Sequence, residues 1–472
     1  MIIKEFDLKD TLSIFESFRS RPFPFLLDSG MDPSRLGRYS IMGSDPFLVI
    51  RTKGRDIALF DGDSWVRKED DPFSVLRQLL GRYQLSGNHN LPVVAGAFGY
   101  FSYDLGRLLE KLPVHSADDL KVPDLYLGFY DRLVIIDHLE GRAFFTSTGL
   151  PEEGVERLKR EKRRLRELEE IIANTRAQVD PVKHAGFGGT PKIFGHFSHD
   201  SYCRAVQKVK DYIAAGDIFQ ANLTQRFSCP LEIDPWHLYL RLRSENPAPF
   251  AAYLQYPELD VVSASPERFL RVRGPFVETR PIKGTRPRGR NPEEDIRLRD
   301  ELLHSEKDRA ELTMIIDLER NDLGKVCSYG SVHVPELICL EKYATVFHLV
   351  STVRGVLAPG RDLVDLLCAT FPGGSITGAP KIRAMEIIEE LEPVRRGIYT
   401  GSIGYLGFDG NADLNIVIRT FIVKDGMAYF NVGGGIVADS DPEAEYWETI
   451  TKARALLRAL GHHREEVAVC LE

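Results

Sequence analysis

Short apolar runs separated by turn residues fill the first third of this 472-residue chain. The clearest runs are FLVI (47–50), DIALF (56–60), VVAGAFGYF (93–101) and RLVIIDH (132–138). Gly, Asp and Pro lie between them, and these residues favour turns and interrupt regular structure. Residues 1–147 therefore predict a series of β-strands joined by turns.

The pattern changes after residue 150. PEEGVERLKREKRRLRELEEIIANTRAQ (151–178) predicts one long charged helix, and DPVKHAGFGGTPKIFG (180–195) predicts a loop. From Ser198 onward helices and strands alternate; HDSYCRAVQKVKDYIAAG (199–216), for example, has helical spacing. We expect an N-terminal region at 1–150, a helix and linker at 151–197, and a catalytic region at 198–460.

Composition excludes several classes of protein. The content of 43% hydrophobic and 28% charged residues is that of an ordinary globular enzyme. The six cysteines form no CxxC pair, which predicts reduced thiols. The chain has neither a signal-like start nor about 18 consecutive apolar residues, so we expect a cytoplasmic protein. A net charge of −8 gives no case for nucleic-acid binding, and the basic cluster at 158–168 is interleaved with glutamates, as on a solvated helix.

Two predicted helices each carry an acidic pair spaced three residues apart. Asp308 and Glu311 lie in one, and Glu445 and Glu448 lie in the other. Residues three apart share one helix face, so each helix could present two carboxylates to a common point. Oxygen ligands without nearby His or Cys favour Mg²⁺ over Zn²⁺. The alternative is that each pair belongs to a solvated helix surface.

Glycine-rich segments suggest sites for an anion. They are GGSITGAPK (373–381), YTGSIGY (399–405) and NVGGGI (431–436), whose backbone amides could approach a carboxylate closely. Plain tight turns are the alternative, and none of the segments matches a nucleotide-binding fingerprint. Arg419 and Lys452 could neutralise a carboxylate, or could form ordinary surface ion pairs.

Together these motifs resemble the chorismate-utilising enzyme family. The resemblance is carried by PIKGTRPRG (281–289), SEKDRAE (305–311), DLERNDLG (317–324), FPGGSITGAPK (371–381), RRGIYTGSIGY (395–405) and GGGIVADSDPEAEYWETITKA (433–453). FLLDSG, GRYSIMGSDP and GAFGYFSYDLGR, all within the first 107 residues, resemble the N-terminal region of anthranilate synthase component I. The resemblance implies an α/β (α+β) fold, in which two large antiparallel sheets pack face to face with helices outside.

The resemblance also implies roles for individual residues. Asp308, Glu311, Glu445 and Glu448 match Mg²⁺ ligands and their supporting partners. Glu267 matches an acid that protonates the departing C4 hydroxyl, and His348 matches an active-site histidine. The positions that match substrate contacts are Ser375, Tyr399, Arg419, Gly433, Gly434 and Lys452.

Two positions bear on which family reaction is catalysed. Lys283 stands in PIKGT, where anthranilate and isochorismate synthases usually have alanine. In the resembled enzymes that aminate C4, this lysine attacks C2 of chorismate and ammonia then attacks C4. By composition alone Lys283 would be a solvated loop lysine. Gln220 stands where water-using isochorismate and salicylate synthases have a basic lysine, and glutamine is not a useful base.

The resemblance therefore favours a Mg²⁺-dependent amination of chorismate to 4-amino-4-deoxychorismate, on the route to 4-aminobenzoate and folate. The main alternative is anthranilate formation for tryptophan synthesis, with isochorismate formation third and a non-catalytic scaffold last. No glutaminase motif is present, so a separate glutamine amidotransferase subunit is implied as the ammonia source. Ser29 in FLLDSG matches a tryptophan pocket, although Asp28 replaces the usual glutamate; a strand end and turn is the alternative.

Overall fold

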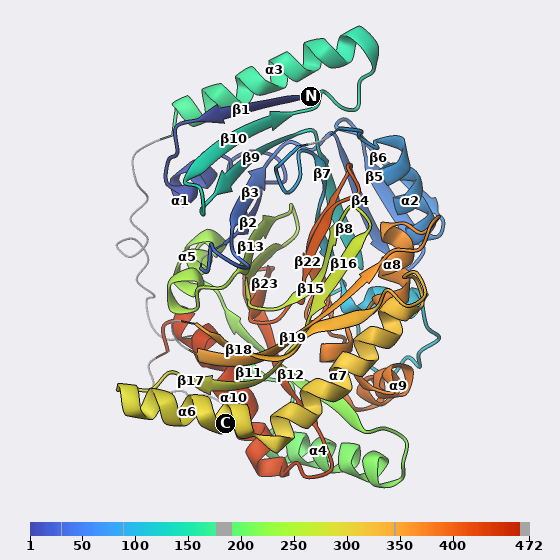
Figure 1. The fold of residues 1–472 in the computed structure, drawn as a ribbon, viewed down its shortest axis with the longest axis vertical. Helices are drawn as coiled ribbons and strands as arrows, with labels where there is room; N and C mark the ends of the chain where they lie inside the picture. The colour runs from blue at the N-terminus through green and yellow to red at the C-terminus, as the bar shows by residue number, and fades with distance from the viewer. Residues whose placement is uncertain (30, 88, 176–190, 344–345, 463–472) are drawn as a thin grey trace.

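Two twelve-stranded antiparallel sheets lie face to face in the computed structural model of the chain, and helices cover their outer faces (Figure 1). The structure describes residues 1–29, 31–87, 89–175, 191–343 and 346–462. This arrangement confirms the fold class that the sequence predicts. Both sheets contain strands from each side of the 151–197 segment, so the chain crosses between the sheets more than once.

The first sheet joins N-terminal strands to strands of the catalytic region. Its order is β1 (Ile2–Phe6), β10 (Arg142–Ser147), β9 (Arg132–Asp137), β3 (Tyr39–Gly43), β2 (Phe25–Asp28), β13 (Phe250–Gln255), β14 (Asp260–Ser265), β23 (Thr420–Lys424), β24 (Met427–Ile436), β12 (Gln220–Pro230) and β11 (Phe194–Gly195), and β20 (Gly378–Ala379) also pairs with β12. The N-terminal and catalytic parts meet where β2 pairs with β13.

The second sheet also combines N-terminal strands with strands of the catalytic region, and the two groups meet where β7 pairs with β21. Its order is β17 (Ile282–Pro287), β19 (Val346–Val356), β16 (Phe276–Arg280), β15 (Arg268–Arg273), β22 (Ala412–Asn415), β21 (Ser402–Gly407), β7 (Gly96–Phe101), β8 (Leu125–Tyr130), β4 (Leu48–Lys53), β5 (Asp56–Phe60) and β6 (Trp65–Glu69), and β18 (His333–Lys342) also pairs with β19.

Helices and short 3₁₀ turns surround the two sheets. They are α1 (Thr11–Glu16), α2 (Pro72–Arg82), η1 (Tyr103–Leu108), α3 (Gly154–Ala173), α4 (His199–Ala214), α5 (Pro235–Glu245), α6 (Pro292–His304), α7 (Glu306–Gly324), α8 (Leu363–Thr370), η2 (Gly374–Ile376), α9 (Lys381–Leu391) and α10 (Pro442–Ala459). No helix in the described ranges is long and apolar enough to cross a membrane.

Three apolar cores correspond to these layers. Between the sheets, the rings of Phe25 and Phe98 stack with centroids 4.4 Å apart. A second core packs α1, α4, α5 and α10 against the first sheet, and a third packs α2, α7 and α8 against the second sheet. Burial of aromatic and aliphatic side chains on both faces of each sheet fixes the sheets' positions.

The four apolar runs identified in the sequence lie in or overlap strands β4, β5, β7 and β9. The predicted charged helix is α3, which is shorter at both ends than the 151–178 pattern. Most of the predicted 180–195 loop, and Cys470, lie outside the described residues, and the five described cysteines are free.

Candidate active site

A β-bulge places Lys283 at the edge of the second sheet. The pairing of β17 with β19 shifts register between Lys283 and Thr285, and Gly284 between them has φ +74°. A side chain at Gly284 would be strained by that angle and would also meet Asp308 at 2.9 Å. The glycine thus allows β17 to approach helix α7 and directs the Lys283 side chain toward it.

Glu311 on α7 receives that side chain. Lys283 Nζ lies 2.8 Å from Glu311 Oε1, and its side chain is only 10% exposed. Gln220, at the start of β12, donates from Nε2 to the same oxygen at 2.6 Å. Burial raises the pKa of Glu311, but the Lys283 ammonium and the two hydrogen bonds outweigh burial and lower it.

The second acidic pair lies at the beginning of α10. Asp441 caps this helix by accepting from the backbone N–H of Ala444, and Pro442 occupies the first turn. Glu445 is buried and accepts from Ser440 Oγ at 2.6 Å, whereas Glu448 faces Lys452 at 2.8 Å. Burial and the neighbouring Glu448 charge raise the pKa of Glu445 despite the Ser440 hydrogen bond.

Glycines of β24 lie close to Glu311 of the first acidic pair and to both carboxylates of the second pair. A Cβ at Gly434 would lie 3.3 Å from Glu445 Oε2 and 3.6 Å from both Glu448 Oε1 and Lys452 Nζ. A Cβ at the next residue, Gly435, would overlap the Gln220 amide and the Glu311 carboxylate. Lys452 Nζ also donates to the Gly433 carbonyl at 2.9 Å. Both helices therefore present carboxylates to adjacent residues of one strand.

Each of the four predicted metal ligands has a basic partner. The pairs are Asp308 with Arg286 at 3.2 Å, Glu311 with Lys283 at 2.8 Å, Glu445 with Lys307 at 3.6 Å and Glu448 with Lys452 at 2.8 Å. An all-oxygen donor set fits Mg²⁺, and a bound cation would oppose the burial and the Glu448 charge that together raise the pKa of Glu445. The same residues would have to release these ion pairs to coordinate it.

Glu267 lies where the chain passes from β14 in the first sheet to β15 in the second. Burial raises its pKa to about 6, even though the Ser375 hydroxyl bonds to it and Lys283 and Arg419 lie near enough to oppose the shift. Its Oε1 has no hydrogen-bond partner among the described residues. A buried carboxyl group of this kind can hold a proton near neutral pH and donate it.

His348 on β19 is buried, and its Nδ1 lies 2.8 Å from Thr285 Oγ1. Burial and the Arg419 charge lower the pKa of His348 to about 3. The imidazole is therefore neutral at physiological pH and suits hydrogen bonding better than charge neutralisation. Arg419 has φ +52°, and its Nη1 donates to Asn246 Oδ1 at 3.2 Å.

Tyr399 is buried beside an ion pair that sequence reasoning missed. Arg396 and Glu392 are 2.7 Å apart and almost fully buried. Arg396 also donates to the carbonyls of Ile376 and Asn222, while Thr224 donates to Glu392. This network fixes the glycine-rich segment that carries Ser375 against β12. The i, i+4 spacing of Glu392 and Arg396 gave no signal, because α9 ends at Leu391 and Pro393 follows Glu392.

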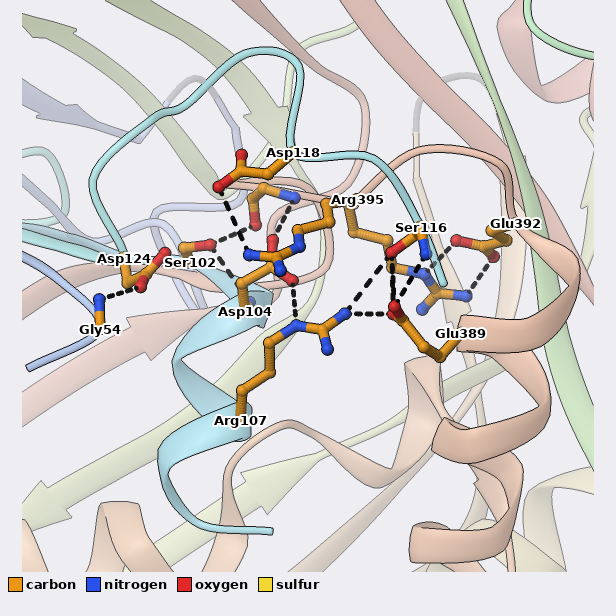
Figure 2. Close-up of polar contacts among 12 residues, drawn as sticks. Gly54, Ser102, Asp104, Arg107, Ser116, Asp118, Asp124, Glu389, Glu392 and Arg395 are labelled. Atoms are coloured by element: carbon orange, nitrogen blue, oxygen red, sulfur yellow. Dashed lines mark hydrogen bonds and ion pairs between the residues drawn. The ribbon is translucent and has the colours of Figure 1, made fainter. Parts of the chain in front are cut away.

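A further polar network ties this part of the chain to the N-terminal region (Figure 2). Glu389 accepts from Ser116 and Arg107, and Asp104 accepts from Arg107 and from the backbone N–H of Gly397. The Lys381 ammonium, also missed from the sequence, is enclosed by Asp322 and the carbonyls of Thr370 and Pro372. Both networks support the segments that carry Ser375 and Tyr399.

Ser29 lies apart from all these residues. Its Oγ donates to the Tyr39 carbonyl at 2.6 Å, and it lines a cavity of about 80 Å³ between the sheets. The other residues of the lining include Leu27, Asp28, Pro249, Phe250, Arg273, Tyr405, Asp413 and Asn415. None of the predicted catalytic or metal-binding residues belongs to this lining.

Comparison with known proteins identifies a family and several relatives of this chain. The family model described as chorismate binding enzyme matches residues 25–458. A Bacillus subtilis protein named aminodeoxychorismate synthase component 1 is 42% identical over 96% of this chain and 94% of its own length. A Thermus thermophilus protein named anthranilate synthase component 1 is 45% identical over 93% of this chain and 92% of its own length.

A solved structure of a relative has a similar fold. The crystal structure of anthranilate synthase component I from Streptococcus pneumoniae superposes with a TM-score of 0.78 at 33% identity, and the match covers 91% of this chain and 94% of that one. The match of the family model over most of the chain, together with these relatives, shows that the chain belongs to the family of chorismate-binding enzymes.

Proposed function

We propose that this chain is the large subunit, component 1, of aminodeoxychorismate synthase, which converts chorismate and ammonia to 4-amino-4-deoxychorismate. The observation that carries the proposal is the placement of Lys283. Its Nζ is held 2.8 Å from Glu311, its side chain is 10% exposed, and its charge acts on Glu267, Glu311 and Glu448. A lysine in the middle of these groups is not a solvated loop residue.

In the proposed reaction Lys283 releases a proton to solvent when chorismate displaces its ion pair with Glu311, and its neutral Nζ then forms a bond to C2 of chorismate. The C4–O bond breaks as Glu267 donates a proton, and the hydroxyl leaves as water. Ammonia next forms the C4–N bond, and the C2–N bond to Lys283 breaks. Amination at C4 and recovery of the lysine both follow, and Lys283 acts as a nucleophilic catalyst.

The surrounding residues suit these steps. Glu267 has the raised pKa and unpartnered oxygen that a proton donor needs. Gln220 positions Glu311 by its 2.6 Å hydrogen bond and offers no base that would activate water at C2. Ser375, Tyr399, Arg419, Gly433, Gly434 and Lys452 are proposed to hold the two carboxylates of chorismate, and His348 to bond the substrate as a neutral imidazole.

Mg²⁺ is proposed as the metal, held by Asp308, Glu311, Glu445 and Glu448, where it would neutralise a chorismate carboxylate. Ammonia is proposed to come from a glutamine amidotransferase subunit, because relatives named component 1 match almost the full length of the chain. Free ammonium should replace that partner in a purified reaction, although less efficiently.

Anthranilate synthesis is the second candidate. It is favoured by the relatives named anthranilate synthase component 1, one of which is 45% identical over 93% of this chain. In that function Lys283 would serve only as the counter-ion of Glu311. The two candidates use the same substrate and the same acidic residues, so the product must distinguish them.

The deciding experiment incubates the purified chain with chorismate, Mg²⁺ and ammonium, and separates the products by chromatography with mass detection. We expect 4-amino-4-deoxychorismate from the wild type and a loss of at least about a hundredfold in Lys283→Ala, the scale expected for a nucleophile. Lys159→Ala, on the outside of α3 with a side chain 66% exposed, is the matched control and should keep full activity. Chelation of Mg²⁺ should stop the reaction.

Anthranilate as the wild-type product would overturn the proposal in favour of the second candidate. Full C4 amination by Lys283→Ala would remove the lysine from the chemistry while leaving the product assignment in place. Measuring the intact mass of the wild-type chain after rapid quenching adds an independent readout, because a covalent adduct at Lys283 would add the mass of chorismate less one water.

We also propose that the cavity beside Ser29 binds tryptophan. Its mixed lining, apolar from Leu27 and Pro249 and polar from Asp413 and Asn415, suits an aromatic amino acid. Added L-tryptophan should raise the midpoint of thermal unfolding of the wild type. Ser29→Trp, which fills the cavity, should remove that effect, and no shift in the wild type would refute the assignment.

A further inference from the structure

We infer that His199, Cys203 and Glu443 form a binding site for a soft divalent cation of the Zn²⁺ class, separate from the active site. His199 and Cys203 lie one turn apart in α4, and Glu443 lies in the first turn of α10. One ligand atom from each lies within 4.8 Å of the other two. Imidazole and thiolate are the ligands that distinguish Zn²⁺ from Mg²⁺.

The two distances to His199 Nε2 lie on either side of those expected in a tetrahedral site. His199 Nε2 lies 2.7 Å from Glu443 Oε2, and Cys203 Sγ lies 3.9 Å from His199 Nε2. Zinc bound to nitrogen, oxygen and sulfur at its usual lengths separates such atoms by about 3.4–3.6 Å in a tetrahedron. Coordination would lengthen the separation of His199 and Glu443 and shorten that of Cys203 and His199, and solvent can supply the fourth ligand.

Neighbouring side chains already hold the ligands in position. Asp200 Oδ1 lies 3.0 Å from His199 Nδ1, so this carboxylate can accept from the outer nitrogen while Nε2 faces the cluster. Trp447 Nε1 donates to Glu443 Oε1 at 2.7 Å, which leaves Oε2 for the metal. The Tyr446 ring meets the His199 ring edge-on with centroids 4.7 Å apart.

The local charge favours a cation. Asp200, Asp441 and Glu443 all act on the Cys203 thiol with negative charge. Both ring nitrogens of His199 face carboxylate oxygens, and the hydrogen bonds to Asp200 and Glu443 raise the pKa of His199, so a positive charge is favoured at this position. A metal at Nε2 would replace the imidazolium proton there and would also allow the thiol to ionise.

The site would join two helices. α4 and α10 pack together at one end of the molecule (Figure 1), and Glu443 lies two residues before Glu445 in α10. A cation held by both helices would fix the first turn of α10, which also carries Glu445. The expected role is therefore structural, and a divalent ion should stabilise the chain without taking part in turnover.

Cobalt titration of the chelator-treated full chain, with excess Mg²⁺ present, tests the inference. Co²⁺ bound to a thiolate should give one equivalent of charge-transfer absorption in the near ultraviolet, together with visible bands of tetrahedral cobalt, and Zn²⁺ should displace both. Cys203→Ser should abolish the thiolate band, and Glu443→Gln should weaken Co²⁺ binding at least about tenfold, as for loss of one ligand or its partner. Cys339→Ser, a half-buried free cysteine in β18, is the matched control.

Thermal unfolding gives a second readout. Zn²⁺ at a hundredfold excess over its Kd should raise the unfolding midpoint of the wild type by about 3 °C, and should not raise that of Cys203→Ser. The active-site carboxylates contain no thiolate, so their failure to bind metal would not affect the charge-transfer band. Persistence of that band in Cys203→Ser, or its absence from the wild type, would overturn the inference.

Discussion

The buried carboxyl group of Glu267 has one unpartnered oxygen and a pKa raised to about 6, while its ordinary value is 4.5. If Glu267 donates a proton to the leaving hydroxyl, its protonated form is the active one. The protonated fraction falls about tenfold for each pH unit above the pKa. At the scale of single residues, this group therefore makes the proposed chemistry sensitive to pH.

We expect kcat/KM for C4 amination to fall as pH rises through about 6. In the pH profile of the free enzyme, this falling limb would report the loss of the Glu267 proton. Glu267→Gln should lower kcat/KM by about a hundred- to ten-thousandfold, the range for loss of a general acid, and should remove that limb. Measurements must use a saturating and constant concentration of unprotonated ammonia. A limb that persists unchanged in Glu267→Gln would assign the titration to another group.

Two neighbouring glycines of β24 give a sharper residue-scale test. A Cβ at Gly435 would overlap Gln220 and Glu311, whereas a Cβ at Gly434 would lie no closer than 3.3 Å to any side chain. We therefore expect Gly435→Ala to reduce Mg²⁺-dependent turnover more than tenfold and Gly434→Ala to reduce it less. Steady-state kinetics, with circular dichroism to check folding, make the comparison. Equal effects would mean that the Gly435 backbone does not set the spacing of the site.

The site residues that could be predicted from the sequence are those that lie in recognisable motifs. Lys283 was singled out by PIKGT, and the structure places it against Glu311. The basic partners Lys307 and Arg286 cannot be predicted from the sequence, because they reach the acidic residues through the fold and not through helical spacing. The raised pKa of Glu267 also depends on burial, which a single sequence does not specify at one glutamate.

Individual elements were predictable where their boundaries carry strong local signals. α10 begins at an Asp441 cap with Pro442 behind it, and α7 begins at a Ser305 cap. The 151–178 pattern extends past the end of α3, where Asn174 occupies the C-cap, a position at which asparagine is a stop signal. The bulge at Gly284 was missed because it depends on pairing with β19.

The Glu392–Arg396 pair joins the end of α9 to β12 and to the glycine-rich segment before it. Both side chains are buried, so loss of one leaves the other as an uncompensated charge. We expect Arg396→Met to lower the free energy of unfolding by about 3–5 kcal/mol. Urea denaturation followed by tryptophan fluorescence measures the change.

The control for this element is the exposed i, i+4 pair of Arg297 and Glu301 on α6, with atoms 3.8 Å apart. Arg297→Met should change stability by less than about 1 kcal/mol, as for most surface ion pairs. A similar loss in both variants would show that burial does not govern the effect. A stable Arg396→Met protein would show that Glu392 is satisfied by Thr224 alone.

At the scale of the whole molecule, the proposed active site takes its residues from both sheets. Gln220 and Gly435 come from the first sheet, and Lys283 and His348 from the second. Glu267 lies at the crossover between them. The face-to-face packing was predictable only through the family resemblance, because strand patterns do not reveal which distant strands pair.

The regions 1–150 and 198–460 describe the sequence, but each sheet joins a block of N-terminal strands to a block of strands from the catalytic region. β13 pairs with β2, and β21 pairs with β7, so residues 198–472 alone would expose two unpaired strand edges and half of the core between the sheets. We expect this fragment to aggregate or to unfold without a cooperative transition, and the full chain to unfold in one. Co-expression with residues 1–197 should restore a soluble complex in which both fragments co-purify. A 198–472 fragment that unfolds cooperatively by itself would show that the catalytic region is an independent domain and that the N-terminal strands only extend its sheets.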